Sequence, residues 1–114
     1  MSANRDDAAL LDIFLAAGKV LKYIQGCDQV EFLSDDKTQS AVVFQLLIIG
    51  EAVKRISFPY RGKHPQIPWN AIAGMRDNLI HNYDDIDLDE VWRTASIDIP
   101  VLRQHVEPLL PKQP

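Results

Sequence analysis

The stretch that decides the fold is residues 41–53, which read AVVFQLLIIGEAV. Almost every position of this stretch carries an apolar side chain, and the large ones are Val42, Val43, Phe44, Leu46, Leu47, Ile48, Ile49 and Val53. A helix that is apolar around most of its circumference is typical of a buried element. Ser34 is a good N-cap residue. The sequence therefore predicts a helix from about Ser34 to Ser57 at the centre of a helical bundle.

Before this stretch, apolar residues recur in steps of three and four, which indicates an amphipathic helix. They are Leu10, Ile13, Phe14, Ala17, Leu21 and Ile24. Asp6 and Asp7 favour the N-terminal end of this helix, and Gly26 is a plausible stop. Asp28 and Glu31 have the spacing of a capping box, which predicts a short turn there.

After it, the residues that break helices gather in 58–68, and they are Pro59, Gly62, Pro65 and Pro68. They predict a proline-rich loop. A third helix is expected from Trp69 to about Asn82, and a fourth after Asp87, capped with the help of Glu90 and kinked at Pro100. No strand pattern, repeat or domain boundary is visible. The prediction is an all-α fold: one domain over residues 1–114, a four-helix bundle with the proline-rich loop between helices 2 and 3.

Composition narrows the classes of function. The 114 residues carry a formal net charge of −4, which argues against a bulk nucleic-acid binder but leaves room for a local basic site. No apolar run approaches the length of a membrane span, and the polar N-terminus does not resemble a signal peptide. The one cysteine, Cys27, fits a reducing cytosol. We find no zinc-type Cys/His spacing, Walker loop or Gly-x-Gly-x-x-Gly pattern, so we expect no metal and no cofactor.

The third predicted helix places a charge among apolar residues. At about 100° per residue, one face collects Trp69, Ile72, Ala73, Arg76, Leu79, Ile80 and Tyr83. An unpaired buried guanidinium would cost several kcal/mol. Either Arg76 pairs with a carboxylate of the central helix, for which Glu51 is the candidate, or Arg76 opens onto a cleft or subunit interface and meets an anion.

His81 lies five residues beyond Arg76, which corresponds to about 140° of rotation in an ideal helix. The two side chains therefore do not converge by themselves. Either the helix ends or distorts between them, or two copies of the helix meet across a dimer axis and build a site jointly. The simpler alternative is an exposed His81 paired with Asp77, four residues earlier.

Charge is segregated around this helix. Residues 52–76 hold no acid but five basic residues and one histidine, which are Lys54, Arg55, Arg61, Lys63, Arg76 and His64. Residues 77–90 hold six acids and neither Lys nor Arg. One interpretation is a solvated loop followed by helix-capping acids. The other is that the loop supplies Arg61, Lys63 and His64 to bind phosphates beside Arg76. Tyr60, Trp69 and Tyr83 could then stack on unpaired bases, although the preferred interpretation of Trp69 is a core anchor.

The order Arg76, four residues, His81, one residue, Tyr83 matches a motif of the HepT-like toxins, which belong to the HEPN superfamily of ribonucleases. The similarity extends to four further segments, which are Ile49-Gly50-Glu51-Ala52, Ile67-Pro68-Trp69, Met75-Arg76-Asp77 and Val91-Trp92. Together with the helix order, the chain resembles this family over nearly its whole length.

The resemblance implies a homodimeric, metal-independent endoribonuclease with Arg76 and His81 as catalytic residues at the dimer interface. From the chemistry of the residues themselves, we expect Asp77, Asn78 and Glu51 to support this pair and Arg61, Lys63 and His64 to contact RNA. The resemblance also implies a cytoplasmic toxin–antitoxin pair whose antitoxin, a minimal nucleotidyltransferase, adds AMP to Tyr83. The alternative is a HEPN-type helical module that binds a nucleotidyltransferase partner or a nucleotide without catalysis.

Overall fold

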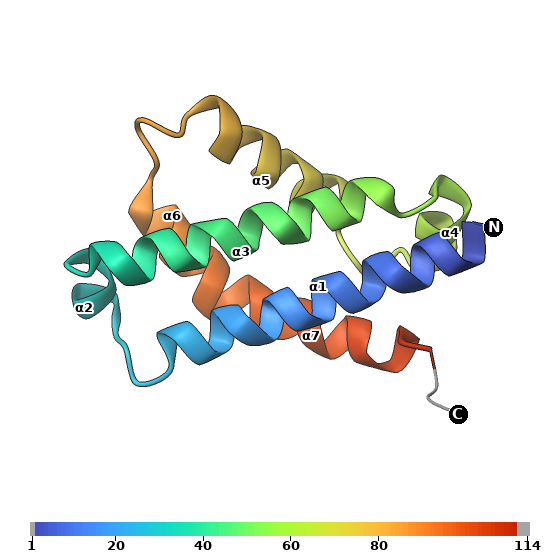
Figure 1. Ribbon diagram of the computed structural model, residues 1–114, viewed down its shortest axis with the longest axis horizontal. Helices are drawn as coiled ribbons and strands as arrows, with labels where there is room; N and C mark the ends of the chain where they lie inside the picture. Colours follow the sequence, from blue (N-terminus) through green and yellow to red (C-terminus); the bar gives the residue numbers. More distant parts are fainter. Residues whose placement is uncertain (1, 112–114) are drawn as a thin grey trace.

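All regular structure in the described part of the chain, residues 2–111, is helical in the computed structural model (Figure 1). The helices follow one another as α1 (Ser2–Ile24), α2 (Gln29–Leu33), α3 (Asp36–Arg55), α4 (Phe58–Lys63), α5 (Trp69–His81), α6 (Leu88–Arg93) and α7 (Ile99–Val106). A π-helical turn, Thr94–Asp98, joins α6 to α7, and a 3₁₀ turn, Glu107–Leu109, follows α7. The predicted all-α class is confirmed.

Helix α3 is the central element, as its sequence predicts. Figure 1 shows α3 running along the length of the molecule with α5 on one side and α1 on the other. The buried side chains that α1 and α3 contribute to the core include Leu10, Ile13, Ala17, Val20, Val42, Leu46, Ile49 and Val53. One expectation is too strong, because α3 is not enclosed all round: Phe44 is 59% exposed. Among the described residues no helix is long and apolar enough to cross a bilayer.

The caps of the short helices follow the sequence closely. Asp28 and Glu31 form the predicted capping box at the start of α2. The cap of α3 is Asp35 rather than Ser34, because the Asp35 carboxylate accepts hydrogen bonds from both the amide and the hydroxyl of Thr38. Ser34 instead ends α2, where its hydroxyl donates to backbone carbonyl groups.

The predicted proline-rich loop is partly wrong, because residues 58–63 form the helix α4. Ser57 caps α4 by accepting a hydrogen bond from the amide of Tyr60. Pro59 lies in the first turn, where the amide hydrogen that proline lacks has no helical partner in any case. Within the predicted loop, the backbone is irregular only from His64 to Pro68. The short helix α4 is therefore one that the expected four-helix arrangement does not include.

The predicted fourth helix is interrupted immediately before Pro100. The amide of Ile99 donates to the carbonyl of Thr94, five residues earlier, which defines the π-helical turn. Proline cannot donate to the carbonyl four residues before it, and its ring crowds that carbonyl. A wider turn relieves this crowding, so the irregularity lies where Pro100 predicts a kink.

A buried carboxylate ties the N-terminal end of α1 to the start of α4. Asp6 is only 5% exposed. Its two carboxylate oxygens accept hydrogen bonds of 2.8 Å from the amide and from the hydroxyl of Ser57. The sequence assigned Asp6 to the start of the first helix, but α1 begins at Ser2. Asp6 therefore acts between helices, holding the residue that caps α4.

We predict that Asp6→Ala lowers the free energy of unfolding by about 2–3 kcal/mol, because Ser57 loses two charge-assisted hydrogen bonds in a partly buried position. Urea unfolding measures this change. Asp12→Ala is the matched control, since Asp12 is half-exposed and bound to Arg55, and we expect it to cost no more than about 1 kcal/mol. Equal losses in the two variants would contradict the role of Asp6.

Candidate active site

Helices α3 and α5 cross in direct contact at Gly50 and Arg76. A Cβ atom built on Gly50 would lie 2.1 Å from the Cβ atom of Arg76 and 2.7 Å from its Cγ atom. Only glycine leaves room for the arginine side chain to leave α5 at this crossing. Sequence reasoning gave Gly50 no physical role, although a glycine in the middle of a long helix costs about 1 kcal/mol and so calls for a packing reason.

The Arg76 guanidinium is held by carboxylates from both helices. Its Nη2 lies 3.2 Å from Glu51 Oε2, and its Nη1 lies 3.1 Å from Asp77 Oδ1. The Nε atom is buried and has no hydrogen-bond partner. The side chain as a whole is 23% exposed, and that of Glu51 is 47% exposed. Arg76 therefore pairs with Glu51, as the first alternative expects. It also reaches the surface, as the second alternative requires.

Asp77 does not pair with His81. Its carboxylate lies 2.5 Å from Lys54 Nζ on α3 and also accepts from Arg76. The hydrogen bond from Lys54, followed by that from Arg76, lowers the pKa of Asp77. Because the pKa is lowered in the folded chain, the stabilisation from ionised Asp77 is present above its unfolded pKa of about 4 and is lost as the pH falls. At neutral pH Asp77 is an anion that fixes Arg76.

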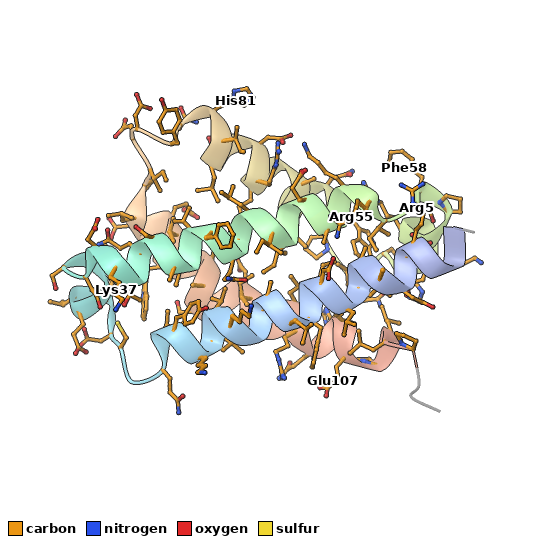
Figure 2. All side chains as sticks on the ribbon, in the orientation of Figure 1. Arg5, Lys37, Arg55, Phe58, His81 and Glu107 are labelled. Atoms are coloured by element: carbon orange, nitrogen blue, oxygen red, sulfur yellow. The ribbon has the colours of Figure 1, made fainter. Side chains whose placement is uncertain are left out.

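His81 is the last residue of α5, and its side chain is exposed. Figure 2 shows His81 at the outer edge of the molecule, pointing away from the bundle. Asn82 ends the helix: its backbone amide donates to the Asn78 carbonyl, and its side-chain amide donates to both the carbonyl and Oδ1 of Asn78. The helix is regular up to His81, so the expected rotation of about 140° from Arg76 persists. A single chain does not bring the guanidinium and the imidazole together.

Tyr83 follows two residues after His81 and is 78% exposed. Behind the end of α5 lies a groove of about 280 Å³ between α5 and α6. Its polar lining is formed by Asn78, Asn82, Asp85, Asp87, Glu90 and Thr94. These side chains include three carboxylates and no cation, so the groove does not suit a phosphate.

An apolar band borders Arg76 and Glu51. On α3, Phe44 is exposed and Leu47 and Ile48 are half-exposed, at the spacing that puts them on one face with Glu51. On α5, Ile80 is 43% exposed and lies four residues after Arg76. Exposed apolar surface of this kind marks interaction sites.

The predicted phosphate-binding residues lie at the other end of α5 from His81, on and after α4 (Figure 1). Arg61 Nε and Nη2 donate to the carbonyls of Ile56 and Val53, at 3.2 and 2.9 Å, which caps the end of α3. The His64 ring lies 4.5 Å from the Tyr60 ring. The structure therefore uses Arg61 to cap α3 and places Lys63 and His64 at the end of α4, before the start of α5.

Two further expectations concern metals and stacking. Within the described residues, no group of three or more His, Cys, Asp or Glu side chains is arranged to hold a metal ion. Trp69 is 5% exposed and donates its indole hydrogen to the His64 carbonyl at 3.0 Å. It is a core residue, in agreement with its preferred interpretation, and is not available for a base.

Comparison with known proteins adds an independent finding. Residues 13–109 match the family described as HepT-like, "Ribonuclease HepT-like". A protein of Thermococcus cleftensis named "Probable ribonuclease HepT" is 48% identical over 79 residues, which cover 69% of this chain and 72% of the relative.

Two further relatives carry the name "Putative RNase". One from Methanocaldococcus jannaschii is 38% identical over 103 residues, covering 90% of this chain and 89% of the relative. One from Caldanaerobacter subterraneus subsp. tengcongensis is 38% identical over 94 residues, covering 82% and 84%. No solved structure matches the chain.

We predict that Gly50→Ala destabilises the chain by about 2 kcal/mol or more, because its Cβ atom would have to push α5 away from α3. Gly74→Ala on α5 is the matched control, since its Cβ atom meets nothing within 4 Å. The control should gain about 0.5–1 kcal/mol from helix propensity. The melting temperatures of the two variants, compared with that of the unaltered chain, test this prediction. A higher melting temperature for Gly50→Ala would show that α3 and α5 do not cross in close contact.

Proposed function

Since the chain belongs to the HepT-like ribonuclease family, we propose that it is a metal-independent endoribonuclease whose active site is completed by a second copy of the chain. The observation that carries this proposal is the state of Arg76. Its guanidinium is fixed by two carboxylates, reaches the surface inside an apolar band, and has no histidine beside it. The missing partner is an imidazole, and His81 of another copy is free to supply it.

The apolar band favours a second copy as the occupant of this face. In a two-fold symmetric pair the same patch of each chain meets its counterpart, so each Arg76 comes near the partner's α5. Phe44 and Ile80, exposed in the single chain, would then be buried. A symmetric dimer brings two Arg76 and two His81 side chains to one interface, which no conformation of the regular helix α5 achieves alone.

The reaction needs no metal, because RNA carries its own nucleophile. His81 takes the proton of the 2′-hydroxyl, the 2′-oxygen bonds to phosphorus, and the bond from phosphorus to the 5′-oxygen breaks. The leaving 5′-oxygen takes a proton from solvent water, and the protonated His81 returns its proton to solvent. The products are a 2′,3′-cyclic phosphate and a 5′-hydroxyl. An imidazole can accept a proton and give it up again, and Arg76 stabilises the charge that develops on the phosphate.

The neighbouring residues position these two groups. Glu51 and Asp77 hold the guanidinium in one orientation, and Lys54 offsets the charge of Asp77. Asn78 accepts from Asn82 and so fixes the last turn of α5, from which His81 projects. Lys63 and His64 contact RNA phosphates away from the cut.

We further propose that the chain is the toxin of a toxin–antitoxin pair and that a nucleotidyltransferase antitoxin adds AMP to Tyr83. Tyr83 is accessible, since it is 78% exposed, and it lies two residues from His81. The added phosphodiester carries negative charge and bulk next to the site, which repels the RNA backbone.

A second candidate function is a non-catalytic binding module for a nucleotidyltransferase or a nucleotide. The separation of Arg76 from His81 along a regular helix favours it. The two candidates differ in one measurable respect, because only the ribonuclease leaves 2′,3′-cyclic phosphate ends.

We expect His81→Ala to lower RNA cleavage by roughly 10²–10⁴-fold, the usual contribution of a general acid–base residue, without changing the melting temperature. The assay follows 2′,3′-cyclic phosphate ends in the presence of a chelator. His105→Ala on α7 is the control and should cleave like the unaltered chain. Cleavage that survives in His81→Ala, or that the chelator abolishes, would refute the mechanism.

Tyr83→Phe should keep the ribonuclease activity but escape the antitoxin. Intact-mass measurement after co-expression with the nucleotidyltransferase should show an AMP adduct on the unaltered chain and none on Tyr83→Phe. Tyr23→Phe, which changes an exposed tyrosine of α1, should still be modified. An adduct on Tyr83→Phe would place the modification elsewhere.

A further inference from the structure

Phe58 is an exposed aromatic side chain with a rigid support. It opens α4, and 78% of it is exposed. The guanidinium carbon of Arg61 lies 4.7 Å from the centroid of the Phe58 ring. That guanidinium is itself fixed by its hydrogen bonds to the carbonyls at the end of α3. One face of the ring is therefore backed by a cation held in place, and the ring remains open to solvent.

Three cations lie at the same end of the molecule as this ring. The hydrogen bonds between Asp6 and Ser57 bring the N-terminal end of α1 and the start of α4 together, so Arg5 lies at the same end of the molecule as Phe58 (Figure 2). Among the described residues, no carboxylate lies within 4.0 Å of the charged groups of Arg5, Arg61 or Lys63.

Other cations of this region are engaged. Lys54 is bound to Asp77, and Arg55 to Asp12. Of the acids near α4, Asp6 is buried and bound to Ser57, and Asp7 is partly buried; burial of the Tyr60 ring, followed by the charges of Asp7 and Asp6, raises the pKa of Tyr60. The surface around Phe58 is thus locally basic in a chain whose net charge is −4.

We propose that Phe58, Arg5, Arg61 and Lys63 form a docking site for single-stranded RNA, separate from the site of cleavage and resting on the proposed ribonuclease function. An unpaired base stacks on the open face of Phe58 and a flanking phosphate lies against Arg5, while Lys63, at the other end of α4, contacts the backbone farther along the strand. Stacking on an aromatic ring accepts any base, whereas the bases of a duplex are not available to it.

The location of this docking site sets the length of RNA that uses it. Helix α5 has 13 residues and begins near α4, while His81 stands at its far end. At 1.5 Å per residue it is about 20 Å long. An RNA that occupies both places must span several nucleotides, so the docking site selects long, unpaired substrates and does not act on the bond that is cut.

The test measures binding of a fluorescent, unstructured RNA of roughly 20 nucleotides to chains that carry His81→Ala, so that nothing is cleaved. Adding Phe58→Ala should weaken binding at least about fivefold, the lower range for loss of one stacked base. Phe58→Tyr should restore it, because the ring is kept. Val30→Ala is the matched control: Val30 is 76% exposed on α2, away from these cations, and its loss should change nothing.

Two further measurements sharpen the result. Lys63→Gln should reduce the slope of log affinity against log salt concentration by about 0.7, as expected for one lost phosphate contact on a single strand. Duplex RNA of the same length should bind equally to the chains with and without Phe58→Ala.

Unchanged single-strand affinity in Phe58→Ala, or an equal loss in Val30→Ala, would overturn the docking site. So would a change in oligomeric state on Phe58→Ala, which would make this surface an interface between copies, or a loss confined to binding of a protein partner. Failure of the ribonuclease proposal looks different, because the chain with His81 intact would then leave RNA uncut while Phe58→Ala still weakened its binding.

Discussion

The crossing of α3 and α5 is the constraint on which the rest of the molecule depends. Gly50 removes the side chain that would otherwise occupy the position of Arg76. Glu51 and Asp77 then hold the guanidinium from either side. A charge that would be costly among apolar residues becomes a fixed, partly exposed cation. Its preorganised position is what an anionic transition state requires.

The same helix that positions Arg76 keeps His81 away from it. Since α5 is regular to its last residue, the two side chains leave it in directions about 140° apart. Rotamer changes do not remove this angle, and the exposed Phe44 and Ile80 show where another protein surface would fit. The proposal of an active site shared between two copies rests on this helix geometry and on one apolar band.

Much of this arrangement was predictable from the sequence, because it depends on local patterns. The run of apolar residues predicts the central helix. The spacing of Asp28 and Glu31 predicts the capping box, and the position of Glu51 on the central helix predicts the partner of Arg76. Tertiary contacts explain what was missed. Ser57 and its hydrogen bonds to Asp6 support the helix α4 in a stretch where the prolines predict a loop. The capping role of Arg61 depends on where α3 ends in space, which residue order does not reveal.

Subunit mixing tests the shared site most directly. Chains carrying Arg76→Ala are co-expressed with chains carrying His81→Ala, and the mixed dimers are assayed for RNA cleavage. Each mixed dimer regains one site with an intact arginine from one copy and an intact histidine from the other, so random pairing should restore about a quarter of the full activity. Activity no higher than that of either variant alone would contradict a site built from two copies.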